Sequence, residues 1–234
     1  MRRYSLVWIT TIVTLTLLLH SCSSQKYIAG RGYLVSLKQE EQGFGLYSYI
    51  LFSKPSTVHT RELYLSVIEN YLNSIPRIEE LQRYVGRDSL NLVSLPLLRK
   101  PLSSFGSLDD RQKAQWLLDN YDYARAKVYL SKFEASLTKG PYIVSHTKAL
   151  SVVNSVTEGY IVQNLSQVNA RVVSLWVDAF LQQSAKAEFW DGEHLNRFVY
   201  DLRNFIANAA EGLKEVSDSL SWWKAKLDEW IVQK

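Results

Sequence analysis

The sequence is poor in the residues that staple small secreted domains or that build most catalytic centres. Its 234 residues include one cysteine and four histidines. A domain held by disulfides needs an even number of cysteines, so a single thiol excludes an internal disulfide framework. The sequence also has no Gly-x-Ser-x-Gly elbow and no His-Glu-x-x-His zinc helix. This scarcity predicts no catalytic residues, no metal site and no cofactor, and it favours a protein that is not an enzyme.

Charge of one sign is not concentrated anywhere along the chain. The sequence has 27 Lys and Arg residues against 23 Asp and Glu residues, which gives a formal net charge of +4. Nucleic acid binding needs a clustered basic footprint, so no nucleic acid partner is expected. Arg83, Arg87, Arg99 and Lys100 form a modest basic group. Scattered surface charge is its simplest interpretation, and contact with lipid head groups or anionic wall polymer is the alternative.

The apolar stretch near the N-terminus is too short for a stable membrane-spanning helix. Residues 6–19 are mostly apolar but include four threonines, whereas a spanning helix needs roughly 20 apolar residues. The stretch follows the basic head Met1-Arg2-Arg3 and leads into Leu19-His20-Ser21-Cys22. A basic head, an apolar run and a small residue before the cleavage point are the parts of a secretory signal peptide.

Residues 1–22 resemble a bacterial lipoprotein signal peptide. A leucine lies three residues before Cys22 and a small residue lies directly before it, whereas His20 departs from the usual small or β-branched residue. The resemblance implies that Cys22 becomes the mature N-terminus and carries a diacylglycerol thioether and an N-acyl chain such as palmitate. Ser23, rather than aspartate, implies placement on the periplasmic face of the outer membrane. The alternatives are an ordinary secretory signal with an incidental cysteine, or an uncleaved anchor.

The chain divides into four expected segments. These are a signal peptide (1–21), a short polar tether (22–31), an α+β body (32–190) and a helical C-terminal segment (191–234). The body is predicted to be a small, mainly antiparallel sheet covered on one face by amphipathic helices. The long C-terminal helical segment is expected to pack on the body or on a partner.

Hydrophobic periodicity predicts the elements of the body. Alternating residues predict a β-hairpin with strands at 33–38 and 46–52 around a turn at 39–45. Further strands are predicted at 90–95, 142–145 and 160–165. Helical spacing predicts three helices: 64–75, a long helix that a Ser107-x-x-Asp110 capping box opens and Gly140-Pro141 ends, and a last one from Val168 to about Trp190.

The C-terminal segment carries the most regular pattern. Its first apolar set recurs every seven residues: Leu195, Leu202, Ala209, Val216, Trp223 and Trp230. A second apolar set follows each member by four residues, as in the a/d register of a coiled coil. Core packing is the simplest role for Trp223 and Trp230, whereas Trp222 points about 100° away from that seam. Trp222, Trp223 and Trp230 are therefore the expected partner-binding residues, because an exposed indole anchors a protein partner or a membrane interface.

The remaining chemistry-bearing residues have simpler structural interpretations. His59 begins a helix, and His194 with Asp191 is typical of a solvated helix start. Ser145 and His146 are neighbours on a strand, so they point to opposite faces and cannot pair as nucleophile and base. The pair Glu40-Glu41 is expected in a solvated turn.

The sequence therefore predicts a lipid-anchored cell-envelope protein that acts as a tethered interaction or assembly module. Its partners would be the membrane, through the lipid, and a protein of the envelope, and a homo-oligomer stays open. One alternative is a small envelope hydrolase, in which His146 or His194 faces a carboxylate in a cleft. The other is a carrier of lipids or other hydrophobic ligands with an apolar cavity.

Overall fold

The computed structural model describes residues 27–35, 39–133, 137, 140–156, 160–166, 168, 170–185, 190 and 231–233, the last three by their backbone alone. The predicted signal peptide and the heptad pattern up to Trp230 lie outside these residues.

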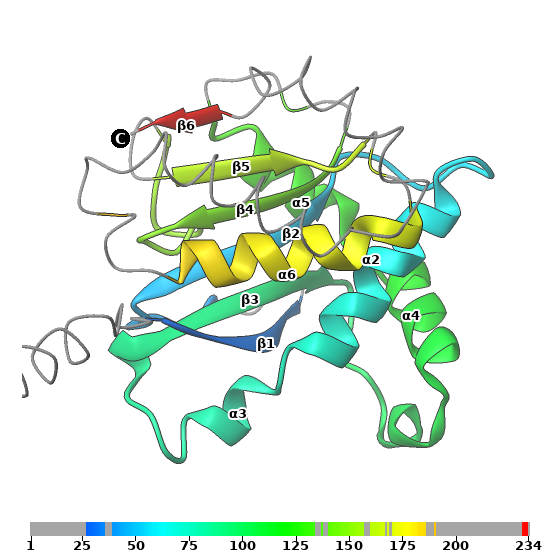
Figure 1. Ribbon diagram of the computed structural model, residues 1–234, viewed down its shortest axis with the longest axis horizontal. Coiled ribbons are helices and arrows are strands. Elements are labelled where there is room, and N and C mark those ends of the chain that lie inside the picture. Colours follow the sequence, from blue (N-terminus) through cyan, green and yellow to red (C-terminus); the bar gives the residue numbers. More distant parts are fainter. Residues whose placement is uncertain are drawn as a thin grey trace, which may run out of the picture.

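One mixed sheet runs through the described residues (Figure 1), and its strand order is β1-β3-β2-β4-β5-β6. Strands β1 and β2 run parallel to β3, whereas β2–β4, β4–β5 and β5–β6 are antiparallel pairs. The α+β class is confirmed, and the expectation of a mainly antiparallel sheet is wrong. The strands are β1 (Ile28–Val35), β2 (Leu46–Phe52), β3 (Leu90–Leu97), β4 (Pro141–His146), β5 (Tyr160–Asn164) and β6 (Ile231–Gln233).

The predicted hairpin is wrong because β3 lies between its two strands. Tyr33 pairs with Leu95 of β3 from one side, and Tyr47 of β2 pairs with Leu92 from the other. Both predicted strands exist, but they run in the same direction. Alternating apolar residues set which face of a strand is buried and carry no information on its partner. Ten residues separate Val35 from Leu46, well beyond the loops of two to five residues typical of hairpins.

Helices cover both faces of the sheet, not one face as the sequence suggested. On one face Tyr64 of α2 stacks on Phe52 with ring centroids 4.3 Å apart, and α6 packs beside α2. On the other face Tyr129 of α5 meets the ring of Tyr49 at 5.5 Å. Figure 1 shows α6 in front of the sheet and α5 behind it. All residues of β2, β3 and β4 are buried, which is the pattern of strands enclosed on both sides. The helices are α2 (Arg61–Ser74), α3 (Ile78–Leu81), α4 (Asp110–Asp119), α5 (Tyr123–Leu130) and α6 (Val173–Ser184).

The long helix predicted after Ser107 is two helices. Helix α4 ends at Asp119, and Asp122 begins α5 by accepting a hydrogen bond from the Arg125 N–H at 2.9 Å. The capping box of α4 is formed by Asp109 and Gln112, not by Ser107 and Asp110. The Asp109 carboxylate accepts from the Gln112 N–H at 2.7 Å, and the Gln112 side chain accepts from the Asp109 N–H at 3.1 Å. Helix 64–75, in contrast, is confirmed by α2.

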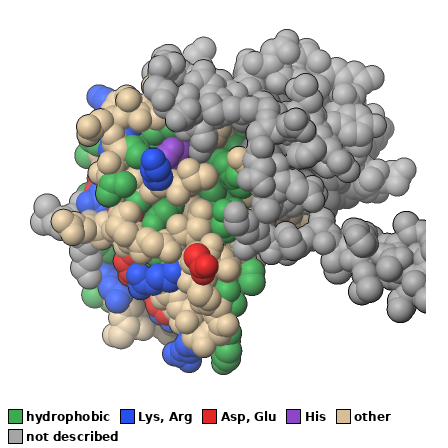
Figure 2. Space-filling model, turned by 90° about the vertical axis from the view of Figure 1, so that its left-hand side faces the viewer, with side chains coloured by type: hydrophobic (Ala, Val, Ile, Leu, Met, Phe, Trp, Pro, Cys, Tyr) green, Lys and Arg blue, Asp and Glu red, His purple; other side chains and the backbone are tan. Residues whose placement is uncertain are grey.

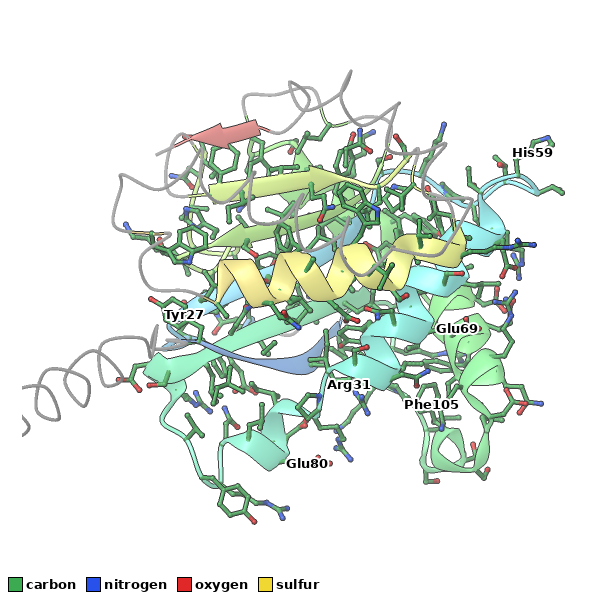
Figure 3. All side chains as sticks on the ribbon, viewed as in Figure 1. Tyr27, Arg31, His59, Glu69, Glu80 and Phe105 are labelled. Carbon is green, nitrogen blue, oxygen red and sulfur yellow. The ribbon has the colours of Figure 1, made fainter. Side chains whose placement is uncertain are left out.

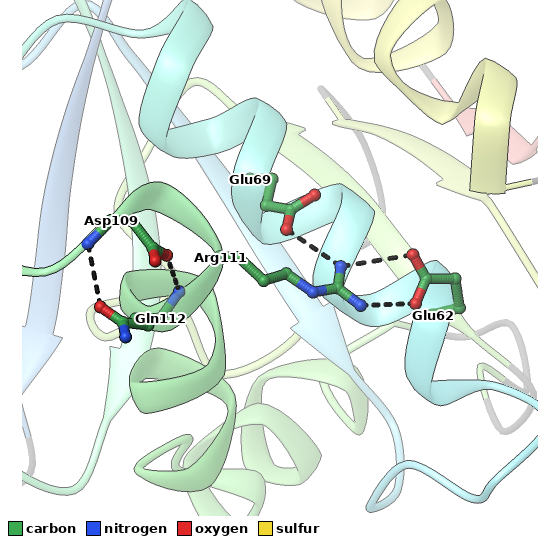
Figure 4. A network of polar contacts seen from close by, with 5 residues as sticks. All are labelled: Glu62, Glu69, Asp109, Arg111 and Gln112. Atoms are coloured by element: carbon green, nitrogen blue, oxygen red, sulfur yellow. Dashed lines mark hydrogen bonds and ion pairs between the residues drawn. The ribbon is translucent and has the colours of Figure 1, made fainter.

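Helix α4 packs outside α2, and Figure 4 shows the ion pairs between them. Arg111 contacts Glu62 at 2.6 Å and Glu69 at 2.9 Å. Exposed ion pairs contribute only about 0–1 kcal/mol each. The buried apolar face of α4, formed by Ala114, Leu117 and Leu118, therefore accounts for most of the attachment.

Both ends of the described chain differ from the expected segments. Strand β1 begins at Ile28, so the last residues assigned to the tether are part of the sheet. Residues Ile231–Gln233 belong to the segment expected to be helical, but they form β6 and pair with β5. None of the described helices has the length and hydropathy that a membrane span requires.

Candidate functional site

The most unusual polar side chain of the body is Glu40. The sequence suggested a solvated turn for Glu40 and Glu41, and Glu41 does lie at the surface, where it pairs with Arg87 at 3.1 Å. Glu40 is only 5% exposed. Gly43, with a φ of 89°, makes the turn that follows and leads the chain into β2. A buried carboxylate is stable only when other groups satisfy it, so its contacts indicate how this part of the body is held together.

Three hydrogen bonds satisfy the Glu40 carboxylate, and each comes from a different segment. The Tyr49 hydroxyl of β2 donates to Oε1 at 2.5 Å. The Tyr129 hydroxyl of α5 donates to Oε2 at 3.3 Å, and the Ser151 N–H donates to the same oxygen at 3.1 Å. Tyr49 also accepts from the Leu150 N–H at 2.8 Å. Glu40 therefore ties the strand, the helix and the turn after β4 into one network.

The environment of Glu40 keeps both tyrosine hydroxyls protonated. Burial is the largest cause that raises the pKa of Tyr49 well above its usual value, and the charge of Glu40 adds to it. Burial and Glu40 raise the pKa of Tyr129 in the same way. A protonated hydroxyl is a donor, so both tyrosines can go on donating to the carboxylate across the neutral range.

A pocket of about 500 Å³ lies above Glu40, between α5, residues 39–42 and the turn at 151–152. One wall is a single face of α5 and its last turn, since Arg125, Val128, Tyr129 and Lys132 are spaced at i, i+3, i+4 and i+7. The pocket thus exists because a helix face and two turns meet over a buried acid.

Two cations and two exposed valines surround this pocket. The Lys132 ammonium donates to the carbonyls of Leu150 at 2.5 Å and Val153 at 2.7 Å, and burial lowers the pKa of Lys132 while the Glu40 charge opposes that effect. Arg125 donates to the Val35 carbonyl at 2.9 Å. The rim carries Val128 and Val152, which are 56% and 61% exposed.

This arrangement is suited to binding an amphipathic group. Its charged and hydroxyl groups can orient a polar end, and its two valines can cover an apolar one. A drug-sized ligand normally occupies a cavity of about 300–1,000 Å³, so the volume fits a small molecule or the side chains of a partner. We name this feature the Glu40 pocket.

The residues that the sequence singled out lie mostly elsewhere. Five of them are outside the part of the chain that the structure describes, namely Cys22, His194, Trp222, Trp223 and Trp230. His59 is exposed in the turn before α2, as expected. His146 is 6% exposed, and its Nδ1 lies 3.0 Å from the Lys148 nitrogen and 2.7 Å from the Lys148 carbonyl oxygen, so this ring nitrogen faces backbone.

Ser145 and His146 point to opposite faces of the sheet. Ser145 Oγ lies 2.6 Å from Ser48 Oγ of the neighbouring strand, on the face that α2 covers, whereas His146 pairs with Tyr47 on the face of Tyr49. The expectation that these two side chains point to opposite faces of a strand is confirmed. Within the described ranges, no group of three or more His, Cys, Asp or Glu side chains could hold a metal ion.

The basic group suggested by the sequence is not one patch. Arg83 and Arg87 precede β3, whereas Arg99 and Lys100 follow it. A strand of eight residues is about 26 Å long, so the two pairs lie at opposite ends of the sheet. The four basic residues therefore do not form one continuous group.

No sequence signal identifies Glu40 as a site. It lies beside another glutamate and before two glycines, which is typical of a surface turn. Its three hydrogen-bond donors are 9, 89 and 111 residues away along the chain. Only the fold brings them together.

Comparison with known proteins gives no match, because no family model fits the sequence and no curated protein or solved structure is significantly similar to it.

Proposed function

We propose that the protein is a lipid-anchored component of the bacterial cell envelope, located at the periplasmic face of the outer membrane, and that its body is a tethered interaction module. The observation that carries this proposal is the position of the single cysteine. Cys22 follows a lipoprotein-like signal, and it lies only five positions before Tyr27, which is buried in the body. A thiol in this position suits acylation, and two or more acyl chains give stable anchoring.

Tethering would make weak binding effective. A body held at a membrane surface meets a partner on the same surface at a much higher effective concentration than in free solution. The Glu40 pocket supports this proposal, because it presents exposed valines and basic groups on one side of the body. Trp222, Trp223 and Trp230 remain proposed partner contacts.

Membrane fractionation tests the anchor. The native chain and the Cys22→Ser variant would be produced in a didermal bacterium, and a fatty-acid analogue would be supplied for metabolic labelling. The native chain is expected to carry the label and to be found in the outer membrane. The Cys22→Ser variant is expected to lose both the label and the outer-membrane location. An unlabelled native chain, or a variant that keeps the label, would contradict the proposal.

Crosslinking in intact envelopes tests the interaction module. The native chain is expected to crosslink to a discrete envelope protein, and Trp222→Ala and Val152→Asp are expected to weaken that product. Val58→Asp is the matched control, since Val58 is 92% exposed and lies in the turn before α2. An equal product from all variants would show that neither proposed surface contacts the partner.

A carrier of small amphipathic ligands is the second candidate, and the size and lining of the Glu40 pocket favour it. A medium-chain fatty acid is a suitable probe, since its carboxylate can meet Lys132 and its chain can lie against Val128. Binding to the native state raises the unfolding temperature with ligand concentration. The carrier is supported if the fatty acid raises the unfolding temperature of the native chain and of Val58→Asp but not that of Val152→Asp. If the unfolding temperature of the native chain does not rise, this ligand class is excluded.

A further inference from the structure

Tyr27 is fixed to the body: its side chain is 6% exposed in a cluster with Leu46 and Ala185, and its N–H donates to the Ala185 carbonyl at 3.1 Å. Four residues lie between Cys22 and Tyr27, so five Cα-to-Cα steps join them. At no more than about 3.6 Å per residue, the covalent chain keeps these atoms within about 18 Å of each other.

Tyr27 lies at one end of the sheet. The parallel strands β1, β2 and β3 all begin there, β4 ends there, and β5 begins beside the end of β4, where Tyr160 pairs with His146. Figure 3 places Tyr27 at this end and His59 at the opposite end. We call this end the anchor edge, and it includes residues 82–88, which lead into β3, and residues 147–148, which follow β4.

Residues 82–88 are in direct contact with the start of the body. The Gly45 N–H donates to the Arg87 carbonyl at 3.0 Å. A Cβ at Gly45 would lie 2.0 Å from the Asp88 carbonyl oxygen and 2.5 Å from the Tyr27 ring, so only glycine allows this approach. The turn before β3 and the attachment point of the tether therefore belong to one surface.

The side chains of the anchor edge suit a membrane surface. Tyr84 is 87% exposed, and the exposed Arg83 lies next to it in the sequence, whereas Arg87 is paired with Glu41. Lys148 is exposed after β4. Figure 2, which faces this side of the molecule, shows Lys and Arg side chains spread among neutral ones, with some Asp and Glu side chains between them. Tyrosine is enriched where a protein meets lipid head groups, and a basic side chain is attracted to an anionic lipid surface.

We infer that the anchor edge rests on the lipid head groups of the membrane, with Tyr84 as an interfacial contact, and that the opposite end of the sheet points away from the bilayer. The inference rests on the proposed acylation of Cys22. A tether of at most about 18 Å is shorter than the sheet, which spans about 26 Å along β3. The end that carries His59 therefore cannot be the end placed on the bilayer.

Site-directed labelling of the acylated, full-length mature protein tests this orientation. Acylation blocks Cys22, so one introduced cysteine can carry a fluorophore, either at the anchor edge (Thr147→Cys) or at the opposite end (His59→Cys); both positions are exposed. Each protein would be reconstituted in vesicles of phosphatidylethanolamine and phosphatidylglycerol that carry a head-group quencher. Strong quenching at position 147 and none at position 59 is expected, and equal or reversed quenching would overturn the inference.

A second pair of variants isolates the contact of Tyr84. In the Thr147→Cys background, Tyr84→Ser is expected to reduce the quenching, whereas Val58→Ser leaves it unchanged. Unchanged quenching in Tyr84→Ser would overturn the interfacial role of this residue.

Mass spectrometry of the same samples separates the two proposals. A preparation with unmodified Cys22 fails the proposed function. An acylated, vesicle-bound preparation with the wrong quenching pattern fails this inference alone.

Discussion

Glu40 and Asn91 are both buried polar residues, but their surroundings differ at the level of single atoms. The Glu40 carboxylate accepts three hydrogen bonds. Asn91 in β3 is completely buried, and neither its Nδ2 nor its Oδ1 has a hydrogen-bond partner among the described residues. Burial of a polar group is unfavourable unless the group is hydrogen-bonded. Replacement of Glu40 should therefore lower the stability of the protein, whereas replacement of Asn91 by an apolar residue should raise it.

Glu40→Gln is expected to lower the free energy of unfolding by about 2–4 kcal/mol. The amide keeps the size of the side chain. Its NH₂ group, however, replaces one carboxylate oxygen, so a hydrogen-bond donor now faces the donors that this oxygen accepted from. Urea denaturation measures the change. Glu41→Gln is the matched control, because its exposed pairing with Arg87 is worth about 1 kcal/mol or less. Equal losses in the two variants would contradict the role of the network.

Asn91→Val is expected to raise the free energy of unfolding by about 1–3 kcal/mol, because it removes a buried amide that lacks partners. Valine also suits a strand enclosed on both faces. Asn91→Asp, which adds a charge at the same position, should destabilise the protein strongly. A loss of stability in Asn91→Val, measured by the same denaturation, would mean that the amide has a partner in the native protein.

Individual helices and strands were predictable where the local pattern of apolar residues is enough to identify the element. The spacing from Tyr64 to Ile75 predicts α2, and residues 142–145 and 160–165 are predicted as the strands that form β4 and β5, without a prediction that they pair. The parallel placement of β1 and β2 beside β3 depends on contacts more than 40 residues apart, as between Leu46 and Asn91. Such pairing leaves no local pattern, and neither does the Glu40 pocket, whose walls meet only in the folded chain.

The start of α4 is a prediction at the scale of one element. Asp109→Ala is expected to lower the free energy of unfolding by about 0.5–2 kcal/mol, since it removes the side chain that accepts from the Gln112 N–H. The comparison is Ser107→Ala, which the sequence pattern favoured as the cap. The exposed Ser107 hydroxyl donates to the Ser104 carbonyl at 2.8 Å, outside α4, so about 0.5 kcal/mol or less is expected. If thermal denaturation shows a larger loss of stability in Ser107→Ala than in Asp109→Ala, the cap belongs to Ser107.

At the scale of the whole molecule, buried tyrosines predict how stability depends on pH. Burial raises the pKa of Tyr49, Tyr71 and Tyr121 well above the usual value of 10.0, and raises that of Tyr64 to about 12. The folded state thus favours the protonated hydroxyl, and this contribution to stability is fully present below pH 10. It declines as the pH rises through and above the unfolded value, because the unfolded chain releases these protons first.

The expected outcome is alkaline unfolding in which the tyrosinate absorbance of the buried residues rises together with the loss of near-ultraviolet circular dichroism. Parallel titrations of absorbance and circular dichroism above pH 10 measure it. A rise of tyrosinate absorbance to its full extent while the circular dichroism stays native would show that these hydroxyls are accessible in the folded protein.

The proposed lipid at Cys22 also has a consequence for the body at this scale. Tyr27 packs against Leu46 and Ala185 at the anchor edge, and the Glu40 pocket opens on the face that α5 covers. A body placed on its anchor edge would hold that pocket beside the bilayer plane, within reach of partners on the same membrane. Every part of this arrangement depends on a lipid at Cys22.

Mass spectrometry of the N-terminal peptide, from protein extracted from bacterial membranes, is the most direct measurement of that central claim. The account predicts that the mature chain begins at Cys22, and that this residue carries a diacylglycerol thioether and an N-acyl chain. A chain that begins at Met1, or a mature chain in which Cys22 is absent or unmodified, would contradict it.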